Sequence, residues 1–234
     1  MSPRTTSVVD GRVERGDRTR RHILDLAVDL ASVNGLDGLS LGDLADRLKM
    51  SKSGLFAAFG SKEELQLATV NRAAEIFVDE VIRIGISAPR GLPRLYGLCE
   101  AWLVYAQGDT FRGGCFFANV ASEFDAKPGP VRDLISQRMR EWLDTIATAV
   151  RKAQKEGHLK PTDVDQLVFE LNSFTMAANW SWQLHRDPRA FDRALVGVRS
   201  RLALEVTKKG LQAAGLLGSS PTAILLAKKR SQFQ

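Results

Sequence analysis

The sequence predicts an all-α protein with a small N-terminal three-helix domain and a larger helical domain behind it. Apolar residues recur at three- and four-residue spacing through most of the 234 residues, the period of a helix with one buried face. No stretch alternates apolar and polar residues for long enough to require a β-sheet. We therefore expect a disordered arm at 1–16, one domain at 17–64, a second at 65–214 and a flexible basic tail at 215–234.

The first helix is expected from Asp17 to Asn34. Asn34 and Gly35 end it, because a glycine just past a helix accepts the left-handed backbone that closes the last turn. His22 is more consistent with a surface side chain than with a metal ligand. The predicted buried stripe consists of Ile23, Leu26, Ala27 and Leu30.

Residues 40–62 predict two short helices joined by a three-residue turn, followed by the start of a third helix. Ser40, Ser51 and Ser61 each stand at an N-cap position, where a hydroxyl can accept a hydrogen bond from the first helical turn. Gly60 ends the second helix. This arrangement is typical of the helix-turn-helix of DNA-binding proteins. The predicted apolar faces are Leu41, Leu44, Ala45 and Leu48 in the first helix, and Leu55 and Phe59 in the second.

The same stretch resembles the DNA-binding end of TetR-type transcriptional regulators. The order and spacing that carry the resemblance are those of Ala27, Leu30, Gly35, Ser40, Leu44, Ala45, Ser51, Leu55, Phe59, Ser61, Lys62 and Leu65. The resemblance implies a homodimer that binds a palindromic operator in double-stranded DNA, an unknown small-molecule effector, and no cofactor. Two departures stand out: Phe56 replaces the tyrosine that commonly donates to a phosphate, and Ala57-Ala58 precede the final Phe59. The reading surface is therefore expected to make fewer polar contacts with the DNA backbone.

The second helix of this motif is expected to lie in the major groove. Lys52 can reach a guanine edge or a phosphate, and Phe56 can meet a thymine methyl. Lys62, in the first turn of the next helix, is expected at a phosphate. The alternative is that these residues are simply solvated. The full set of predicted DNA-binding residues is Arg20, Ser40, Ser51, Lys52, Ser53, Gly54, Phe56, Ala57, Ala58 and Lys62.

The net charge of +6 is weak support for DNA binding because of where the charge lies. Residues 1–64 hold ten basic and ten acidic side chains, and residues 65–207 hold 18 and 17. Residues 208–234 hold five basic residues and no acidic ones. Most of the surplus therefore belongs to the C-terminal tail. The charge that supports DNA binding is that of the six arginines in residues 1–21 and of Lys49, Lys52 and Lys62 around the second helix of the motif.

The rest of the chain is predicted to be helical, with breaks at 85–93, 108–114 and 126–130. The helix that leaves the DNA-binding domain is expected to connect the two domains. Pro130 suits the first turn of a long helix, and Asp163 suits an N-cap. The expected helices are 61–86, 92–107, 115–124, 130–157, 163–185 and 188–214.

A ligand pocket in the second domain is implied by the resemblance. Its candidate residues are large aromatic side chains on different helices together with polar residues inside apolar helices, a mixture that suits an apolar cavity. The alternative is that the aromatic residues are plain core. Cys99 and Cys115 could act as redox sensors, but small buried hydrophobes are the simpler interpretation. The predicted pocket residues are Trp102, Tyr105, Phe117, Glu123, Trp142, Phe174 and Asn179.

The resemblance to TetR-type regulators implies that the last two long helices form a four-helix bundle with those of a second copy. The helix at 163–185 is apolar on more than one side, which suits a core on one face and a subunit interface on the other. The alternative is a fully buried central helix in a monomer. The predicted interface residues are Phe169, Met176, Trp180, Leu195, Val198 and Leu202.

Several classes of protein are disfavoured by what the sequence lacks. It has no apolar run long enough to span a membrane and no apolar leader, and its two cysteines suit a reducing cytoplasm. Glycine-rich phosphate loops, HExxH and CxxC are absent, and the three histidines have no metal-like spacing, so neither catalytic nor metal-binding residues are predicted. The sequence therefore predicts a cytoplasmic transcriptional regulator, a repressor in the first instance. Its rivals are a small-molecule or lipid carrier without specific DNA binding and a non-specific nucleic-acid coating protein.

Overall fold

The computed structural model describes residues 7–108 and 110–214, and its regular structure there is helical apart from one isolated β-bridge. The predicted all-α class is confirmed. The tail at 215–234 and residues 1–6 of the arm lie outside the described residues. The helices are α1 (Ser7–Asn34), α2 (Leu41–Leu48), α3 (Lys52–Phe59), α4 (Lys62–Phe77), η1 (Val78–Ile82), α5 (Arg83–Ile86), α6 (Leu92–Gln107), α7 (Phe116–Phe124), α8 (Pro130–Lys155), α9 (Val164–His185), α10 (Ala190–Ala203) and α11 (Lys208–Ala214).

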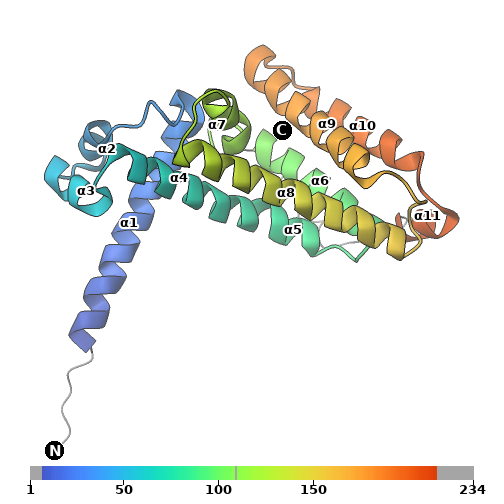
Figure 1. Ribbon diagram of the computed structural model, residues 1–234, viewed down its shortest axis with the longest axis horizontal. Helices are drawn as coiled ribbons and strands as arrows, with labels where there is room; N and C mark the ends of the chain where they lie inside the picture. The colour runs from blue at the N-terminus through green and yellow to red at the C-terminus, as the bar shows by residue number, and fades with distance from the viewer. Residues whose placement is uncertain (1–6, 109, 215–234) are drawn as a thin grey trace, which may run out of the picture.

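α1 begins at Ser7 and not at Asp17, so the expected disorder is wrong for residues 7–16. Adding a residue to an existing helix costs much less than nucleating a new one, and residues 7–16 contain no proline to stop the helix. The N-terminal end of α1 projects away from the body of the molecule (Figure 1). Its C-terminal half belongs to the core, with Ile23, Ala27 and Leu30 at most 2% exposed.

The N-terminal domain lies at one end of the elongated molecule, where α2 and α3 lie beside α1 and the start of α4 (Figure 1). Leu36, Leu44, Leu55 and Leu65 are fully buried at this junction. One leucine thus comes from each of α2, α3 and α4 and one from the loop after α1. Their shared core holds the two short helices, which are too short to be stable alone.

The predicted connecting helix at 61–86 is present as one continuous rod that changes type along its length. α4 passes at Val78 into a π-helical turn, which passes at Arg83 into α5. π turns inside helices are rare and occur frequently at functional sites. Gly85 allows this rod to contact α6 closely, because a Cβ there would lie 2.8 Å from the Cα of Leu98.

The larger domain is built around α6, which contacts α5, α8, α9 and α10. Its apolar side chains are buried around the helix and not along one stripe, as expected of a central helix. α8 runs beside α4, and α9 pairs with α10 on the far side of α6 (Figure 1). Among the described residues, no helix has both the length and the apolar character needed to cross a membrane.

The single helix predicted at 188–214 is wrong, because the chain breaks it between Ala203 and Lys208. Val206 forms a β-bridge with Leu159, and the N–H of Thr207 donates to the carbonyl of His158 at 3.0 Å. The Thr207 hydroxyl then accepts from the N–H of Gly210 at 3.0 Å and so caps α11. β-Branched residues lose side-chain freedom in helices, which favours the break at Val206 and Thr207.

Candidate DNA-binding surface and ligand cavity

The helix-turn-helix has the caps that its serines predict. Each hydroxyl accepts a hydrogen bond from the main-chain N–H three residues on: Ser40 from Asp43 at 3.0 Å, Ser51 from Gly54 at 3.1 Å and Ser61 from Glu64 at 3.1 Å. Lys49 makes the turn between the helices with a left-handed backbone, φ 53° and ψ 39°. The three serines therefore position α2, α3 and α4, and direct contact of Ser40 and Ser51 with DNA stays a prediction.

One face of α3 is open to a partner. Leu55 and Phe59 are buried beneath it, and Phe56 is 58% exposed near its centre. This division leaves a mixed basic, hydroxyl and apolar surface on the helix that the sequence assigns to the major groove. The exposed residues of α3 are the predicted Lys52, Ser53, Gly54, Phe56, Ala57 and Ala58.

The side chain of Arg20 contacts α3 of its own domain. Its guanidinium donates to the carbonyl oxygen of Ala58 at 2.5 Å and lies 4.4 Å from the centre of the Phe59 ring. Both contacts fix the C-terminal end of α3 to α1. We therefore describe Arg20 as a residue that positions the reading helix, and its predicted contact with DNA stays untested.

Lys62 also points back to its own domain. Its ammonium group donates to the carbonyl oxygen of Asp37 at 2.6 Å and lies 3.9 Å from the Asp37 carboxylate. Its side chain is 52% exposed, so the charge remains accessible from solvent. A phosphate contact, as predicted for Lys62, would compete with Asp37 for the same ammonium group.

Asp37, in the loop between α1 and α2, connects the two domains through a second lysine. Lys127, in the turn between α7 and α8, donates to its carboxylate at 2.5 Å, and Gln66 of α4 donates to it at 3.1 Å. The hydrogen bond from Lys127 is the largest cause that holds the pKa of Asp37 below its ordinary value, with smaller contributions from Gln66 and Lys62. One carboxylate thus binds side chains from both domains.

Glu123 is the prediction that the structure corrects most clearly. Its carboxylate accepts from the N–H of Leu36 at 2.7 Å and from the N–H of Asp37 at 2.8 Å, so it holds the α1–α2 loop and does not line a ligand pocket. A Cβ at Gly35 would lie 2.9 Å from the same carboxylate, and Gly35 has a φ of 81°. Free N–H groups after a helix need an acceptor, and α7 supplies one.

The loop before α7 strengthens this contact between the domains. Gly113 donates from its N–H to the hydroxyl of Ser32 at 3.1 Å, and the Asn119 amide donates to the Ser32 carbonyl at 3.0 Å. A Cβ on Gly113 would lie 1.8 Å from that carbonyl oxygen, so only glycine fits. Arg112 pairs with Asp29 of α1 at 2.6 Å. The α7 segment and α1 therefore form one connected unit.

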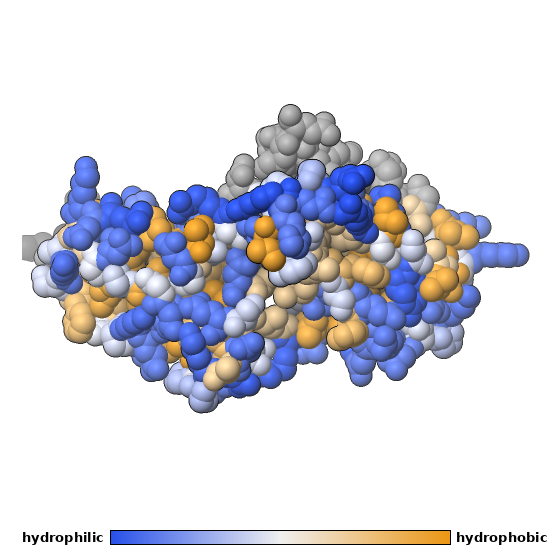
Figure 2. All heavy atoms as spheres, turned by 90° about the horizontal axis from the view of Figure 1, so that it is seen from above, coloured by the Kyte–Doolittle hydropathy of each residue, from blue (hydrophilic) through white to orange (hydrophobic). Residues whose placement is uncertain are grey.

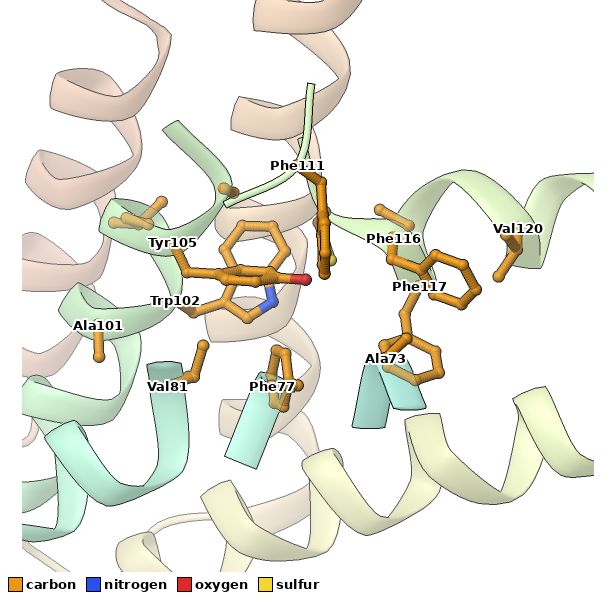
Figure 3. Close-up of a cluster of buried hydrophobic side chains, with 14 of the residues drawn as sticks. Ala73, Phe77, Val81, Ala101, Trp102, Tyr105, Phe111, Phe116, Phe117 and Val120 are labelled. Atoms are coloured by element: carbon orange, nitrogen blue, oxygen red, sulfur yellow. The ribbon is translucent and has the colours of Figure 1, made fainter. Parts of the chain in front are cut away.

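A cavity of about 180 Å³ lies between α4, α6, α7, α8 and α9. Three of the predicted pocket residues, Trp102, Phe117 and Trp142, line it. Figure 3 shows Trp102 and Tyr105 of α6, Phe77 of α4 and Phe117 of α7 converging in the buried cluster beside it. Phe77 meets Trp142 and Phe117 edge to face, with ring centres 5.3 and 6.2 Å apart. The π-helical turn contributes Val78 and Ile82 to the wall.

Three other predicted pocket residues lie elsewhere. Tyr105 is buried beside the cavity and does not line it. Phe174 packs against α10, where a Cβ on Gly197 would lie 2.9 Å from its ring. Asn179 accepts from the N–H of Cys115 at 3.0 Å and so joins α9 to the start of α7. Polar residues inside apolar helices thus satisfy backbone groups here.

One side of the cavity is polar. Arg138 donates from one nitrogen to both oxygens of Glu141, at 3.1 and 2.9 Å, and from another to Asn71 at 2.8 Å. The hydrogen bond from Arg138 is the largest cause that lowers the pKa of Glu141, which keeps this carboxylate ionised. Trp142 donates to the amide oxygen of Asn172 at 3.3 Å, so the Asn172 amide nitrogen remains as a donor at the cavity.

The buried thiols of Cys99 and Cys115 and the phenol of Tyr105 stay protonated at neutral pH. Burial raises the pKa of Cys99 to about 12 and that of Cys115, which lines the cavity, to about 11. Burial likewise raises the pKa of Tyr105 well above its ordinary value, and its hydroxyl oxygen has no hydrogen-bond partner among the described residues. In the described ranges, no three His, Cys, Asp or Glu side chains converge as metal ligands.

Half of the predicted dimer interface lies in the core of the chain itself. Leu195, Val198 and Leu202 of α10 are at most 5% exposed, and Met176 of α9 lines the cavity. The assignments of Leu195, Val198 and Leu202 are therefore wrong. Met176 is half-buried and also borders the hollow beside Trp180 and Leu184, so its place in the interface stays a prediction. The apolar stripe of α10 covers its own domain first, because an amphipathic helix buries its strongest face.

Other apolar residues of α9 and α10 are open to solvent. Phe169 and Trp180, both predicted, are 68% and 59% exposed, and Leu184 and Val196 are 62% and 61% exposed. Figure 2 shows the molecule of Figure 1 from above, the side on which α9 and α10 lie. Apolar side chains are visible there among hydrophilic ones. Large exposed hydrophobic residues grouped on neighbouring helices are typical of a surface that another molecule covers.

Some residues with a defined place in the site have little signal in the sequence. Asp37 and Lys127 are far apart in the chain, and only the fold brings them together. The pair of Arg138 and Glu141 has the three-residue spacing of a helical ion pair, but such pairs are common on exposed faces. The cavity residues Met139 and Asn172 were missed because only one side of each residue's helix borders the cavity.

Comparison with known proteins identifies both domains. Residues 23–69 match the family model described as bacterial regulatory proteins, tetR family. Residues 91–198 match the model described as tetracyclin repressor-like, C-terminal domain. No curated protein matches the chain significantly.

Solved structures of the same fold include several regulators. A TetR transcriptional regulator from Chloroflexus aurantiacus J-10-FL is 25% identical, with a TM-score of 0.76 over 82% of this chain and 98% of that one. A regulator from Saccharomonospora viridis in complex with choline is 22% identical, with a TM-score of 0.70 over 81% and 98%. AibR in complex with isovaleryl coenzyme A and operator DNA is 22% identical, with a TM-score of 0.61 over 78% and 97%. The chain therefore belongs to the TetR family and is a DNA-binding transcriptional regulator.

Proposed function

We propose that the protein is a homodimeric repressor that a small-molecule effector releases from a palindromic operator. The observation that carries the proposal is the position of α7. This helix supplies Phe117 and Ala118 to the cavity wall, and near its C-terminal end it holds the α1–α2 loop through Glu123. A ligand that moves α7 therefore acts directly on the segment that leads into the helix-turn-helix.

A second connection runs through the rod formed by α4, η1 and α5. Its first turn follows the reading helix, and Phe77, Val78 and Ile82 line the cavity from the other end of the same rod. A tilt of the rod changes the distance between the two reading helices of a dimer. A ligand shifts the equilibrium between two tilts of the rod only if it binds the protein more tightly in one tilt than in the other.

The dimer places two α3 helices on one DNA duplex. Reading a palindrome requires a two-fold arrangement with the helices about one DNA turn apart, roughly 34 to 36 Å. The exposed Phe169, Trp180 and Leu184 on α9 and Val196 on α10 supply the surface for this association. The bundle is then formed by α9 and α10 of both copies.

Related folds support an effector of this kind, because the structures with choline and with isovaleryl coenzyme A are of ligand-bound regulators. The role is regulation and not catalysis, and it is exercised in the cytoplasm, where the DNA lies. DNA contacts are assigned to Lys52, Ser53, Phe56 and Ala57 on the open face of α3.

The test is selection of bound DNA from a random pool at moderate salt. We expect a palindromic consensus for the full chain, and a loss of affinity for Lys52→Ala, while Lys155→Ala on the far end of α8 binds normally. If Lys52 contacts a base, its loss should remove about 1–3 kcal/mol of discrimination between sequences. If it contacts a phosphate, its loss should lower the affinity for all sequences alike. Recovery of no consensus would reject a sequence-specific operator.

A further inference from the structure

The cavity between α4 and α9 has a size and a charge balance that restrict its ligand. Its volume of about 180 Å³ lies below the roughly 300–1,000 Å³ of common small-molecule sites. An engineered apolar cavity of about 150 Å³ binds benzene. The space in this cavity therefore matches one six-membered ring with a short substituent better than it matches a larger fused ring system.

The lining favours an aromatic or similarly compact apolar body. Phe77, Phe117, Trp102 and Trp142 present rings from four different helices. Aromatic rings attract one another edge to face, as Phe77 and Trp142 already do at 5.3 Å. Met139 and Met176 complete the wall with unbranched side chains that adapt to irregular shapes.

Electrostatics argues against a charged ligand. The charged residues that line the cavity are Arg138 and Glu141, and they bind each other through two contacts. The pair is locally neutral. An anion would face Glu141 and a cation would face Arg138, and each of these charges is already paired with the other.

Two unpaired donors remain at the cavity: the buried Nε of Arg138, which has no hydrogen-bond partner among the described residues, and the amide nitrogen of Asn172. The amide oxygen of Asn172 is taken by the Trp142 indole N–H, and its amide nitrogen has no hydrogen-bond partner among the described residues. A donor at the edge of an apolar cavity is best satisfied by a carbonyl or hydroxyl oxygen of the ligand.

We propose that the effector of this regulator is an uncharged molecule of single-ring size that accepts a hydrogen bond from Asn172 and stacks among Phe77, Phe117 and Trp142. The proposal rests on the proposed function in taking this cavity as the effector site, and it adds the class of ligand. Binding would place the molecule against Phe117 and Ala118 of α7, and against the π-helical turn.

A matched set of probes tests size, charge and hydrogen bonding separately. The reference is acetophenone, and the comparisons are ethylbenzene, benzoate, protonated benzylamine and 2-acetonaphthone. Binding is measured on the full chain without DNA, from the change in total tryptophan fluorescence, to which Trp102 and Trp142 contribute from the cavity wall, and from the shift of the melting temperature. We expect acetophenone to bind tightest, ethylbenzene about tenfold more weakly for want of the acceptor, and the other three more weakly still.

Variants that fill the cavity test whether acetophenone binds inside it. Ala118→Leu fills it from α7 and is expected to weaken acetophenone binding by about tenfold or more. If Ala118→Leu fails to fold, Thr145→Leu narrows the same cavity from α8. Thr148→Leu introduces the same side chain at an exposed position of α8 and is expected to bind acetophenone as the original chain does.

The outcomes separate this proposal from the regulatory one. Tighter binding of benzoate or benzylamine than of acetophenone overturns the charge argument, and tighter binding of 2-acetonaphthone overturns the size argument. Failure of every probe, with palindromic DNA still selected, rejects the ligand class and leaves the repressor intact. Saturable acetophenone binding that Ala118→Leu weakens, in a chain that selects no palindrome, supports the ligand class and rejects the repressor.

Discussion

The carboxylate of Glu123 in the ligand-binding domain accepts a hydrogen bond from the main-chain N–H of Leu36 at 2.7 Å. Leu36 is fully buried in the loop between α1 and the helix-turn-helix. Glu123 lies near the C-terminal end of α7, and the first turn of α7 lines the cavity. The two domains are therefore joined by a hydrogen bond between a side chain and the backbone, which does not require a particular side chain at position 36.

Replacing Glu123 is expected to loosen this junction. Glu123→Gln removes the charge and turns an amide group toward two N–H donors, which lowers the free energy of unfolding by about 1–3 kcal/mol. Hydrogen exchange of the Leu36 and Asp37 amides should accelerate. Asp125→Asn, an exposed change on the same segment, is the control and should leave both quantities unchanged. Equal protection of the two amides in Glu123→Gln would show that the bond does not hold the loop.

The Asp37–Lys127 contact predicts a specific pH dependence. Because the pKa of Asp37 is lowered in the folded chain, its contribution to stability is present above the unfolded value of about 3.8 and is lost as the pH falls through the lower folded value. Lys127→Gln should raise the pKa of Asp37 toward 3.8, seen in a carboxyl NMR titration. The stability difference from the original chain should be constant at neutral pH and vanish in acid.

Lys155→Gln serves as the control for that titration, since Lys155 lies on α8 and forms no ion pair with Asp37. Both carboxylate and ammonium are nearly half exposed, so solvent screening keeps the stability difference small. A pKa of Asp37 that is the same with and without Lys127 would contradict the cause assigned to it.

Replacing Ser51 and Ser53 one at a time should distinguish a residue that stabilises α3 from one that contacts DNA. Ser51→Ala removes the cap that binds the Gly54 N–H and is expected to lower stability by about 1 kcal/mol. Ser53→Ala keeps that cap and removes only the long contact of its hydroxyl to the Ser51 hydroxyl at 3.3 Å, so it should lower operator affinity with a much smaller change of the melting temperature. Chemical denaturation and DNA titration of both variants check this. Equal loss of stability in the two variants would mean that Ser51 is not the cap in solution.

Association should depend on α9. Trp180→Glu places a charge on the exposed apolar face and is expected to weaken dimerisation by about 2 kcal/mol or more, roughly 30-fold, in a folded chain. Light scattering over a concentration series measures this. Val33→Glu, at a 52% exposed position of α1, is the matched control and should dimerise normally. Leu195→Glu should instead unfold the chain, because Leu195 is 5% exposed.

The two cysteines are expected to resist alkylation in the folded protein. With a pKa of about 11, only about one Cys115 thiol in a thousand is ionised at pH 8, and the thiolate is the reactive form. Both thiols should react with iodoacetamide only after unfolding in urea, as counted by mass spectrometry. Fast modification of Cys115 in the native chain would revive the redox-sensor interpretation.

Local chemistry in the sequence determined the helix-turn-helix, the caps at Ser40, Ser51 and Ser61, and most helix boundaries from Leu92 to His185. These features depend on residues a few positions apart, so spacing alone reports them. The same local rules placed the exposed face of α3. They could not extend α1 to Ser7 or break the last helix at Val206, because helix propagation and the bridge to Leu159 depend on longer segments.

Only the tertiary structure decided what each apolar or polar residue of the second domain contacts. Periodicity identifies an apolar stripe but not the neighbour that covers it, so Leu195, Val198 and Leu202 were assigned to a partner although their own domain buries them. Glu123 was assigned to a ligand for the same reason, whereas its carboxylate accepts from backbone N–H groups 87 and 86 residues away. Contacts across such distances are selected by the packing of the whole chain, which no local pattern encodes.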